Sequence, residues 1–499
     1  MESPTSIARV FDRALADDPA REALVTRSAR LTYGELDALA DRAAYALADL
    51  GVRPGDRVAA SLPNEWEVVV AFHGAMRLGA VWVGVNRVLA APERQYLIDD
   101  SGARLLLAET EVAATAARVT PLDVAGWRAA LDAAPHTPWT GPAVDPFAPA
   151  GLAYTSGTTG HPKGAVHSQH NLLLPGAVLV QTRGYGPALR KGDCFAFTIL
   201  NLAVLTTLLV SQAGGTSIVM DRIDAQGVAE WIERERITTW NGPPALLHSL
   251  AERDDITPDS LRSLREVWTG GADCPESIRR AFETKFGRPV LATYGLSEAP
   301  TVVSIDSPDG LHRPGASGRP LPHLRVRIAD EHGATAAPGD TGEIRVSAAD
   351  DRYRPMLGYW NRPEASAEAL DQGELRTGDL GFLDDQGFVH VRDRAGLLII
   401  RGGANVYPAE VERALADHRH VAAAAVFGVA DERLGERVAA LIEVRDLEAF
   451  ARDGGIDAVL DHLREQLARY KVPERIAVVD ALPRNAMGKV VRTGLVDLL

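Results

Sequence analysis

Cysteine and positive charge are both scarce in this chain. Among its 499 residues there are two cysteines, Cys194 and Cys274. Two thiols give neither a disulfide framework nor a metal-ligand cluster, and they suit a reducing compartment. The 53 Lys and Arg residues are outnumbered by 67 Asp and Glu, which leaves a net charge of −14. This deficit argues against nucleic acid as a partner, and any anionic ligand must be met by local positive groups.

Long hydrophobic segments are also missing. The longest apolar stretch, around Thr198 to Val210, is too short and too polar to cross a bilayer. Residues 1–20 lack the charged-then-apolar pattern of a secretory signal. With 46% hydrophobic and 24% charged residues, the composition is that of a globular enzyme long enough for more than one domain. We therefore expect a soluble cytoplasmic enzyme without a membrane span; no feature fixes its oligomeric state.

Strand and helix patterns alternate over most of the chain. Apolar residues at helical spacing predict helices at Leu36–Gly51, Glu65–Leu78, Gly227–Arg236 and Pro275–Phe286. Short apolar runs predict strands at Arg57–Leu62, Thr216–Met220, Ile237–Trp240, Glu266–Trp268 and Val290–Ala292. In the middle of the chain, the alternation of strands and helices is expected to run from Cys194 to Gly295. The alternation predicts parallel sheets covered by helices, with ligands at the carboxyl ends of the strands.

Two further patterns complete the expected architecture. Between Ser317 and Val346, short alternating strands with Gly, Pro and Asp turns predict a small β-subdomain. After residue 394 the predicted elements are helices at Ala409–Asp417 and Ala458–Ala468 and strands at Val421–Val429, Ala439–Val444 and Arg475–Val479. We expect an α/β protein. Residues 1–393 would form a large N-terminal domain of helix-covered sheets plus the β-subdomain, and residues 394–499 a small mobile α+β domain.

The segment from Tyr154 to Val166 reads YTSGTTGHPKGAV and is the most informative in the chain. Its small residues let backbone N–H groups approach a polyanion, its hydroxyls add donors, and Lys163 adds a positive charge. These features suit a triphosphate; the alternative is a polar surface turn. An ordinary P-loop has Gly-Lys-Ser/Thr at the start of a helix. Here Pro162 precedes the lysine and Gly164 follows it, so no helix is expected at Lys163.

This segment resembles the phosphate loop of the adenylate-forming superfamily, which includes acyl- and aryl-CoA synthetases, adenylation domains of peptide synthetases, and beetle luciferases. Further motifs follow in family order and cover most of the chain. They are WTGGADCP (268–275), YGLSEAP (294–300), RTGDLGFLDDQGFVHVRDR (376–394), GGANVYPAEVE (402–412) and PRNAMGKVVR (483–492). The second has serine where the family has threonine. Together they make a chance match very improbable.

The resemblance implies an acid–thiol ligase that uses ATP, Mg²⁺ and coenzyme A. The implied catalytic residues are Lys489, Glu298 and Lys163, and Glu298 would also bind the Mg²⁺ ion. The implied nucleotide-binding residues are Thr155, Ser156, Gly157, Thr158, Thr159, Gly160, Gly270, Gly271, Ala272, Tyr294, Gly295, Ser297, Asp379 and Arg394. Gly402 and Gly403 would line a tunnel for CoA. The implied acyl-pocket residues are Asn201, Gly242, Trp268 and Leu296.

The chemistry explains the need for these residue types. A carboxylate attacks the α-phosphorus of ATP while pyrophosphate leaves, and because both reactants are anions, positive charge must offset their repulsion. Lys489 is expected to bridge the carboxylate and the α-phosphate. Glu298 offers the hard oxygen that Mg²⁺ prefers. In the family the C-terminal domain then rotates, the lysine withdraws, and the thiol enters beside the glycine-bearing strand.

Two positions depart from the family pattern. The hinge, usually Asp or Lys, falls near Gly396 with Ala395 before it; glycine still permits large backbone rotations. Asn201 stands near the position of the usual histidine, in a segment that shapes the acyl pocket. The expected pocket segments, 198–205, 241–245, 268–270 and Leu296, are mostly apolar. We therefore expect a hydrophobic acid that is fatty, aromatic or alicyclic; Asp193 lies too far before the expected strand to bind a substrate ammonium group.

Several alternatives remain open at this level. The acyl group could pass to a carrier-protein thiol instead of CoA, or the enzyme could perform only the thioesterification step. A luciferase-like oxygenase is less favoured, because no motif reports the added chemistry. A non-catalytic adenylate-binding protein is disfavoured because Lys489, Glu298 and Lys163 are all present.

Overall fold

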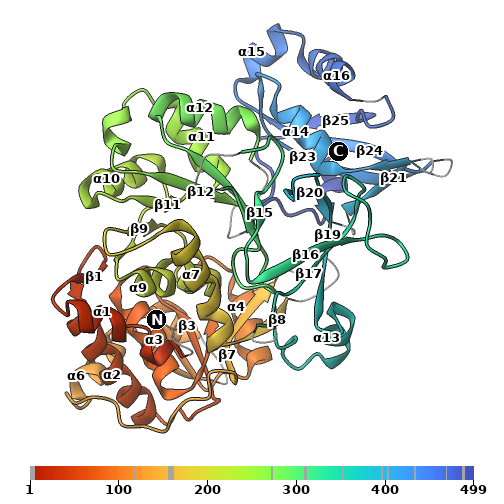
Figure 1. The fold of residues 1–499 in the computed structure, drawn as a ribbon. Coiled ribbons are helices and arrows are strands. Elements are labelled where there is room, and N and C mark those ends of the chain that lie inside the picture. Colours follow the sequence, from red (N-terminus) through yellow and green to blue (C-terminus); the bar gives the residue numbers. More distant parts are fainter. Residues whose placement is uncertain are drawn as a thin grey trace.

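A computed structural model describes residues 6–115, 119–155, 162–270, 274–307, 312–350, 353–394, 397–401, 404–431, 434–467, 469–485 and 489–499. Four β-sheets organise these residues (Figure 1). The N-terminal elements, in red and orange, lie at the opposite side of the view from the C-terminal elements, in blue. Among the described residues, no helix combines the length and hydrophobicity that a bilayer crossing requires.

The first large sheet has six strands in the order β6-β5-β3-β4-β7-β8. Their bounds are β3 (Arg57–Ser61), β4 (Val81–Gly84), β5 (Leu105–Ala108), β6 (Thr120–Asp123), β7 (Pro149–Thr155) and β8 (Lys163–Ser168). All neighbours are parallel except β8, which runs antiparallel to β7. The helices of this region are α2 (Tyr33–Asp49), α3 (Trp66–Leu78), α4 (Ala91–Ser101) and α6 (Val124–Ala133). The strand and helices predicted between residues 36 and 78 are confirmed.

The sequence explains why α2 and α3 form where they do. Thr32 and Glu35 form a capping box at the start of α2, which satisfies backbone donors that the helix cannot pair internally. Helix α3 is buried along nearly its whole length, from Glu67 to Leu78. A helix that is hydrophobic on all sides belongs inside a protein. Gly74 of α3 lies directly against Ala43 of α2, so the two helices pack closely.

The second large sheet has nine strands in the order β15-β14-β13-β12-β11-β9-β10-β1-β2. Their bounds are β1 (Glu22–Val25), β2 (Arg30–Thr32), β9 (Arg190–Asp193), β10 (Thr216–Val219), β11 (Thr239–Asn241), β12 (Glu266–Gly270), β13 (Val290–Tyr294), β14 (Ser304–Ile305) and β15 (Arg319–Pro320). The strands from β13 to β1 are parallel, and β2, β14 and β15 are antiparallel additions at the edges. The predicted strands of this region are confirmed within one or two residues.

Helices cover both faces of this sheet. On one face α10 (Ala225–Glu235), α11 (Pro244–Glu252) and α12 (Glu276–Phe286) pack against an apolar cluster that includes Trp240 and Val267. On the other face α7 (Gln169–Arg183) and α9 (Leu209–Ala213) pack against a cluster that includes Trp268 and Leu291. This arrangement confirms the predicted α/β class of helix-covered sheets.

Strand β9 corrects the expectation that the rhythm begins at Cys194. Its sequence is Arg-Lys-Gly-Asp, which carries no apolar pattern, yet Lys191 and Asp193 are almost completely buried. The strand forms because its charges find partners inside the protein. Asp193 is therefore the last residue of a central strand and does not precede one.

The β-subdomain is an antiparallel sheet in the order β16-β17-β19-β18, with β20 paired to β19. Its strands are β16 (Leu324–Ala329), β17 (Gly342–Ala348), β18 (Leu370–Asp371), β19 (Glu374–Leu383) and β20 (Val389–Arg394). The predicted change to short antiparallel strands is confirmed. The sheet extends beyond the expected end at Val346, because the long strand β19 pairs with both β17 and β20.

The last sheet has the order β22-β21-β24-β23, with β25 paired to β24. Its elements are β21 (Ile399–Arg401), β22 (Ala404–Val406), α14 (Pro408–Ala416), β23 (Val421–Asp431), β24 (Gly435–Val444), α16 (Gly455–Gln466) and β25 (Arg475–Val478). They surround an apolar cluster of their own. All elements predicted here are present, and the proposed boundary after residue 393 falls within the last strand of the β-subdomain.

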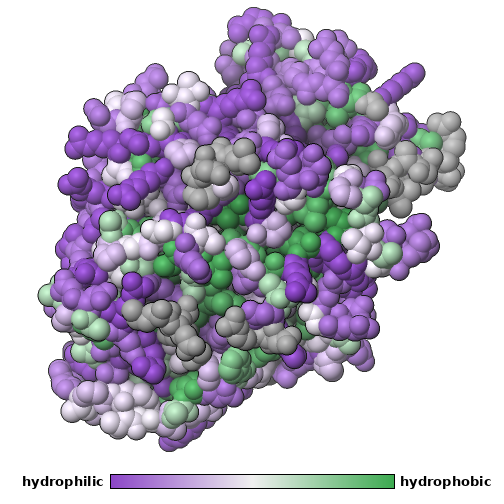
Figure 2. Space-filling view, in the orientation of Figure 1, coloured by the Kyte–Doolittle hydropathy of each residue, from purple (hydrophilic) through white to green (hydrophobic). Residues whose placement is uncertain are grey.

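Shorter elements connect these layers. They are η1 (Ile7–Arg9), α1 (Asp12–Asp17), α5 (Thr110–Thr115), α8 (Leu200–Leu202), the π-helix η2 (Ala203–Leu208), η3 (Pro258–Leu261), α13 (Pro363–Ala369), α15 (Leu447–Arg452) and η5 (Leu495–Leu498). On the face shown in Figure 2 the surface is mostly hydrophilic, and hydrophobic residues gather in a band across the middle.

A hydrogen bond of 2.6 Å between Arg445 and His248 of α11 joins the C-terminal region to a helix that covers the second large sheet.

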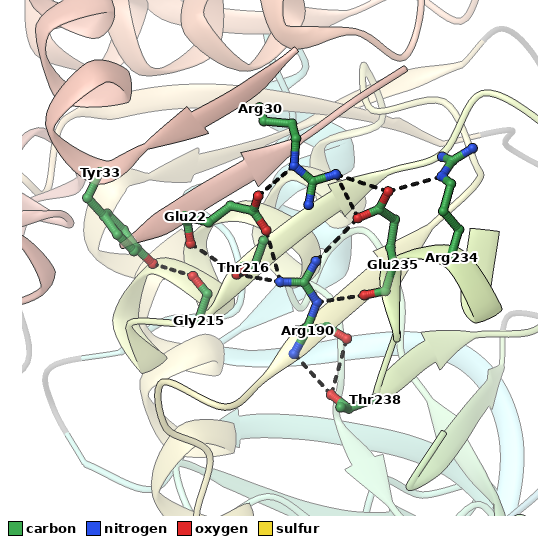
Figure 3. Close-up of polar contacts among 9 residues, drawn as sticks. All are labelled: Glu22, Arg30, Tyr33, Arg190, Gly215, Thr216, Arg234, Glu235 and Thr238. Carbon is green, nitrogen blue, oxygen red and sulfur yellow. Dashed lines mark hydrogen bonds and ion pairs between the residues drawn. The ribbon is translucent and has the colours of Figure 1, made fainter. Parts of the chain in front are cut away.

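A network of polar contacts centred on Arg190 ties together the amino ends of the strands in this second sheet (Figure 3). The Arg190 guanidinium donates to Glu22 at 2.9 Å and to the backbone carbonyl of Glu235 at 2.6 Å. The backbone N–H of Arg190 donates to the Thr238 hydroxyl at 3.0 Å, and its guanidinium also donates to the Thr216 hydroxyl at 3.3 Å. Arg190 of β9 thus joins β1, β10 and the end of α10 through its side chain, and the segment between α10 and β11 through its backbone. Glu235 is only 5% exposed, so its charge depends on these partners.

We predict that Arg190→Ala lowers the free energy of unfolding by about 2 kcal/mol, because a nearly buried carboxylate loses a charged donor. Arg30→Ala is the matched control, since Arg30 contacts the same two glutamates but its side chain is 55% exposed; it should cost less than about 1 kcal/mol. Urea unfolding followed by circular dichroism measures both. Equal losses in the two variants would contradict the central position assigned to Arg190.

Candidate active site

The carboxyl ends of the two large sheets meet. A Cβ atom on Gly84, the last residue of β4, would stand 1.6 Å from the carbonyl oxygen of Thr198, which follows β9. Only glycine allows the two backbones to approach this closely. Strands β7, β12 and β13 end at Thr155, Gly270 and Tyr294. Three of the predicted nucleotide-binding positions thus lie at the ends of parallel strands, where α/β proteins bind ligands.

Several predicted residues lie outside the described part of the chain. They are Ser156, Gly157, Thr158, Thr159, Gly160, Gly271, Ala272, Gly402 and Gly403, together with the hinge residues Ala395 and Gly396. Arg394 is described only through its backbone. The roles of all these residues stay predictions.

Both flanks of the phosphate-loop segment are fixed by hydrogen bonds. Thr155 of β7 pairs with Lys163 of β8, so the two strands form a hairpin around the loop. Lys163 begins a strand, which confirms that the chain does not continue as a helix there. The Tyr154 hydroxyl donates to Asp100 at 2.9 Å, and the Tyr96 hydroxyl donates to the Pro162 carbonyl at 3.0 Å. Burial, together with the neighbouring Asp100 carboxylate, raises the pKa of Tyr154.

Tyr359 brings two predicted catalytic residues together. Its hydroxyl donates to Glu298 Oε1 at 2.8 Å, and its ring centroid lies 5.3 Å from the Lys163 ammonium nitrogen. The backbone around Tyr359 is paired to β8, since Trp360 N–H donates to the Gly164 carbonyl at 2.8 Å. The predicted phosphate-binding lysine and the predicted magnesium-binding glutamate thus share one aromatic side chain. Tyr359 was not predicted, because it lies outside every recognised motif.

A second pair joins predicted nucleotide-binding residues across two sheets. The Tyr294 hydroxyl donates to Asp379 Oδ2 at 2.7 Å, and Asp379 is only 5% exposed. In the β19–β20 ladder Asp379 is the register partner of Arg394. Tyr294, Asp379 and the backbone of Arg394 therefore lie together, although the sequence separates the first two by 85 positions.

The turn after Tyr294 is tightly constrained. A Cβ atom on Gly295 would stand 1.6 Å from the Thr301 carbonyl oxygen, and Thr301 itself has a positive φ of 74°. A β-branched residue with positive φ is a strained conformation of the kind that gathers at functional sites. The buried imidazole of His167 in β8 lies 2.7 Å from the Ser297 carbonyl oxygen and ties this turn to the phosphate-loop hairpin. Neither His167 nor Thr301 was predicted to belong to the site.

The predicted acyl-pocket residues come from four segments. Asn201 lies in α8, immediately before the π-helix η2. Gly242 is buried and its N–H donates to the Trp268 carbonyl at 2.8 Å, while Leu296 is 8% exposed. Trp268 is 2% exposed and its indole N–H donates to Glu266 at 3.1 Å. The centroid of its ring lies 5.6 Å from Arg183 Cζ and 5.3 Å from Lys191 Nζ, so two cations lie within cation–π range of it.

Lys489 belongs to a small hairpin of the C-terminal region. Its backbone N–H donates to Asn485 Oδ1 at 3.0 Å, and its carbonyl accepts from Asn485 N–H at 2.8 Å. Lys489 is exposed. Arg484 and the Leu482 N–H both contact Glu443 of β24, which fixes the hairpin on its own sheet.

Among the described residues, no group of three or more His, Cys, Asp or Glu could hold a metal ion. The single carboxylate of Glu298 fits Mg²⁺, which binds through one or two carboxylates, keeps several waters and takes further oxygens from phosphates.

Comparison with known proteins defines the class. Residues 11–360 match the family model of the AMP-binding enzymes, and residues 410–489 match that of their C-terminal domain. The chain belongs to this family and therefore to the adenylate-forming superfamily. It is an AMP-forming acid–CoA ligase, which uses ATP to activate a carboxylic acid and passes the acyl group to coenzyme A.

Individual relatives cover nearly the whole chain. The sequence is 34% identical over 482 residues to the long-chain-fatty-acid–CoA ligase FadD13 of Mycobacterium tuberculosis, covering 93% of this chain and 92% of that protein. It is 37% identical to a feruloyl-CoA synthase of an Amycolatopsis species, with the same coverage. It is also 32% identical to the fatty acid–[acyl-carrier-protein] ligase ScoC of Streptomyces coeruleorubidus, covering 96% and 95%. The ATP-bound structure of MatB from Rhodopseudomonas palustris superimposes with a TM-score of 0.89 at 30% identity, covering 98% of both chains.

The buried His167 predicts a pH dependence of stability. Burial lowers its pKa from 6.5 to about 4. Between these two values the unfolded chain takes up a proton that the folded chain does not. Stability is therefore complete above pH 6.5 and declines as the pH falls toward 4. We predict that His167→Gln reduces this decline by up to about 1.4 kcal/mol per pH unit, the effect of one proton.

Urea unfolding at several pH values between 6.5 and 4 measures the slope. His136→Gln, at an exposed position, controls for the loss of an imidazole in general. If His167→Gln and the parent show the same slope over this range, the folded His167 takes up its proton as readily as the unfolded one, and the prediction is wrong.

Proposed function

We propose that this enzyme activates a hydrophobic carboxylic acid (fatty, aromatic or alicyclic) and transfers it to coenzyme A. The observation that carries this proposal is the contact of Tyr359 with Lys163, the first residue of β8, and with Glu298, in the turn that follows Tyr294 at the end of β13. The similar proteins FadD13 and feruloyl-CoA synthase are named for a long-chain fatty acid and an aromatic acid. Both names fit the apolar residues that line the expected acyl pocket.

The proposed roles follow from the chemistry of each side chain. Tyr294 stacks on adenine, Asp379 accepts hydrogen bonds from the ribose hydroxyls, and Arg394 donates to the same sugar. Residues 155–160 and Lys163 surround the β- and γ-phosphates. Mg²⁺ bound at Glu298 neutralises phosphate charge when it is present. Tyr359 orients the Glu298 carboxylate through its hydrogen bond.

Lys489 supplies the cation for the first half-reaction. We propose that the domain formed by residues 394–499 closes so that Lys489 lies between the attacking carboxylate and the α-phosphate. The same domain then rotates near Gly396, and the backbone at Gly402 and Gly403 lines the path of the thiol. The exposed position of Lys489, on a hairpin fixed to its own sheet, suits a residue that moves with its domain.

We also propose a cytoplasmic location, which the two free thiols suit.

Lys489→Ala is predicted to lower ATP–pyrophosphate exchange at least about hundredfold, because one preorganised cation is lost from the transition state. Binding of ATP, measured by calorimetry, should change little. Lys471→Ala is the matched control in the same domain; its ammonium contacts Glu410 at 2.6 Å and is not assigned to the reaction. Exchange at the parental rate in Lys489→Ala would refute the assigned role.

One observation supports a carrier-protein thiol as a second candidate for the acyl acceptor: the similarity of this chain to a carrier-protein ligase. Mass spectrometry of products formed with ATP and a panel of fatty, aromatic and alicyclic acids separates the two acceptors. We expect an acyl-CoA product with coenzyme A present and no faster transfer to an acyl-carrier protein. Exchange supported by amino acids alone would overturn the proposed substrate class. Thioester formation from a supplied adenylate, without any pyrophosphate release, would instead identify an enzyme of the second half-reaction only.

A further inference from the structure

One face of the nine-stranded sheet carries buried polar side chains beneath the expected acyl pocket. The strand register places Ser217, Lys191, Thr239 and Glu266 in one row across β10, β9, β11 and β12. One pleat closer to the carboxyl ends, the same register aligns Asp193, Asn241 and Trp268. Residues two apart on a strand point to the same side, so both rows share a face.

The charged pair in these rows is completely enclosed. Lys191 is 0% and Asp193 2% exposed, and Lys191 Nζ lies 2.8 Å from Asp193 Oδ2. The Thr206 hydroxyl of the π-helix η2 also donates to Asp193 Oδ2, and the Ser217 hydroxyl donates to the Thr206 carbonyl at 2.7 Å. Removing two charges from water costs several kcal/mol per ion unless close partners compensate. Oδ2 has such partners.

The other carboxylate oxygen of Asp193, Oδ1, lacks such partners among the described residues. Asp193 Oδ1 is buried and has no hydrogen-bond partner within the described part of the chain. The same holds for the amide nitrogen Nδ2 of Asn241 on the neighbouring strand. Buried polar atoms are nearly always paired, so each exception calls for a missing partner. Here one atom accepts and the other donates, on adjacent strands that are about 4.8 Å apart.

Asn241 belongs to the expected acyl pocket, and Asp193 lies on the strand next to it. Asn241 and Trp268 belong to two of the segments that the sequence assigns to it. The expected pocket segment 198–205 contributes Leu205 of η2, which packs in the same apolar cluster as Trp268. The walls of this region are therefore apolar, while the row that includes Asp193 and Asn241 offers hydrogen bonds.

We propose that the acid carries a hydroxyl group at its far end, which donates to Asp193 Oδ1 and accepts from Asn241 Nδ2. A hydroxyl is the smallest group that both donates and accepts a hydrogen bond. An unsubstituted hydrocarbon tail would leave both atoms buried without partners, which is the situation that disfavours an analogue lacking the hydroxyl. This inference rests on the proposed function and narrows it to hydroxylated acids with an otherwise hydrophobic body.

The test compares matched acids in ATP–pyrophosphate exchange. One pair is cinnamic acid with and without a 4-hydroxyl group; further pairs are plain and ω-hydroxy fatty acids of equal carbon number. We expect kcat/KM to be at least about tenfold higher for the hydroxylated member of the preferred pair, the effect of one hydrogen bond to a charged group. Equal rates, or a preference for the plain member in every pair, would overturn the inference. Exchange with no acid at all would overturn the proposed function, and this inference with it.

Two kinds of variant locate the preference. Lys191→Met/Asp193→Leu/Thr206→Val replaces the enclosed pair and its hydroxyl partner by apolar side chains of similar size, a change that proteins often tolerate. Asn241→Ala removes only the donor and serves if the triple variant does not fold. The triple variant should lower the hydroxyl-to-plain ratio to about one, relative to the roughly tenfold preference expected of the parent. Asn241→Ala keeps Asp193 as the acceptor and should lower the ratio only in part.

Thr207→Val is the matched control. Thr207 neighbours Thr206 on η2, but its hydroxyl lies 2.9 Å from His73 Nε2 on the other side of the helix. This variant should keep the parental ratio. If Thr207→Val loses the preference to the same extent, the ratio reports loosening of η2, and recognition by Asp193 and Asn241 is refuted.

Discussion

The close approach of Gly84 to the Thr198 carbonyl is the constraint on which the site depends. It holds the carboxyl end of β4, in the first large sheet, against the segment that follows β9 in the second. Each sheet alone would present its strand ends to solvent. Because these ends face each other, residues from β7, β8, β12 and β13 reach one region. The second close approach, between Gly295 and Thr301, then fixes the turn that carries Glu298.

Electrostatics explain how an acidic protein handles anionic reactants. The net charge of −14 gives no general attraction to ATP. The cations of the site are held individually: Lys163 lies over the Tyr359 ring, and Lys489 is exposed on a separate domain. In the proposed mechanism the positive charge is divided between two domains, and the full complement is assembled only when they close. The repulsion between two anions is then offset at the moment of reaction and not before.

The sequence patterns predicted local backbone structure. The absence of a helix at Lys163, the strand at Val290–Ala292 and the α/β layers all follow from residues close in sequence. Contacts across the fold were not predictable in this way. Tyr359 and His167 carry no motif, and their roles arise only when distant strands pair. Strand β9 escaped prediction for a related reason: its charged sequence is compatible with burial only if its charges find partners. Lys191 pairs with Asp193 inside the strand, but Arg190 depends on Glu22 and Asp193 on Thr206, which lie elsewhere in the chain.

The enclosed Lys191–Asp193 pair is not explained by stability. A buried ion pair is often no better for folding than hydrophobic residues of similar size, because desolvation offsets the attraction. The neighbouring strands show that apolar packing was available: Trp268 and Leu291 occupy the same row and face of the sheet. A pair retained at such a position, with one carboxylate oxygen left unpaired, makes sense where a ligand completes it. The position of the pair at the strand ends, next to the residues expected to bind the acid, is the reason we propose the substrate as that ligand.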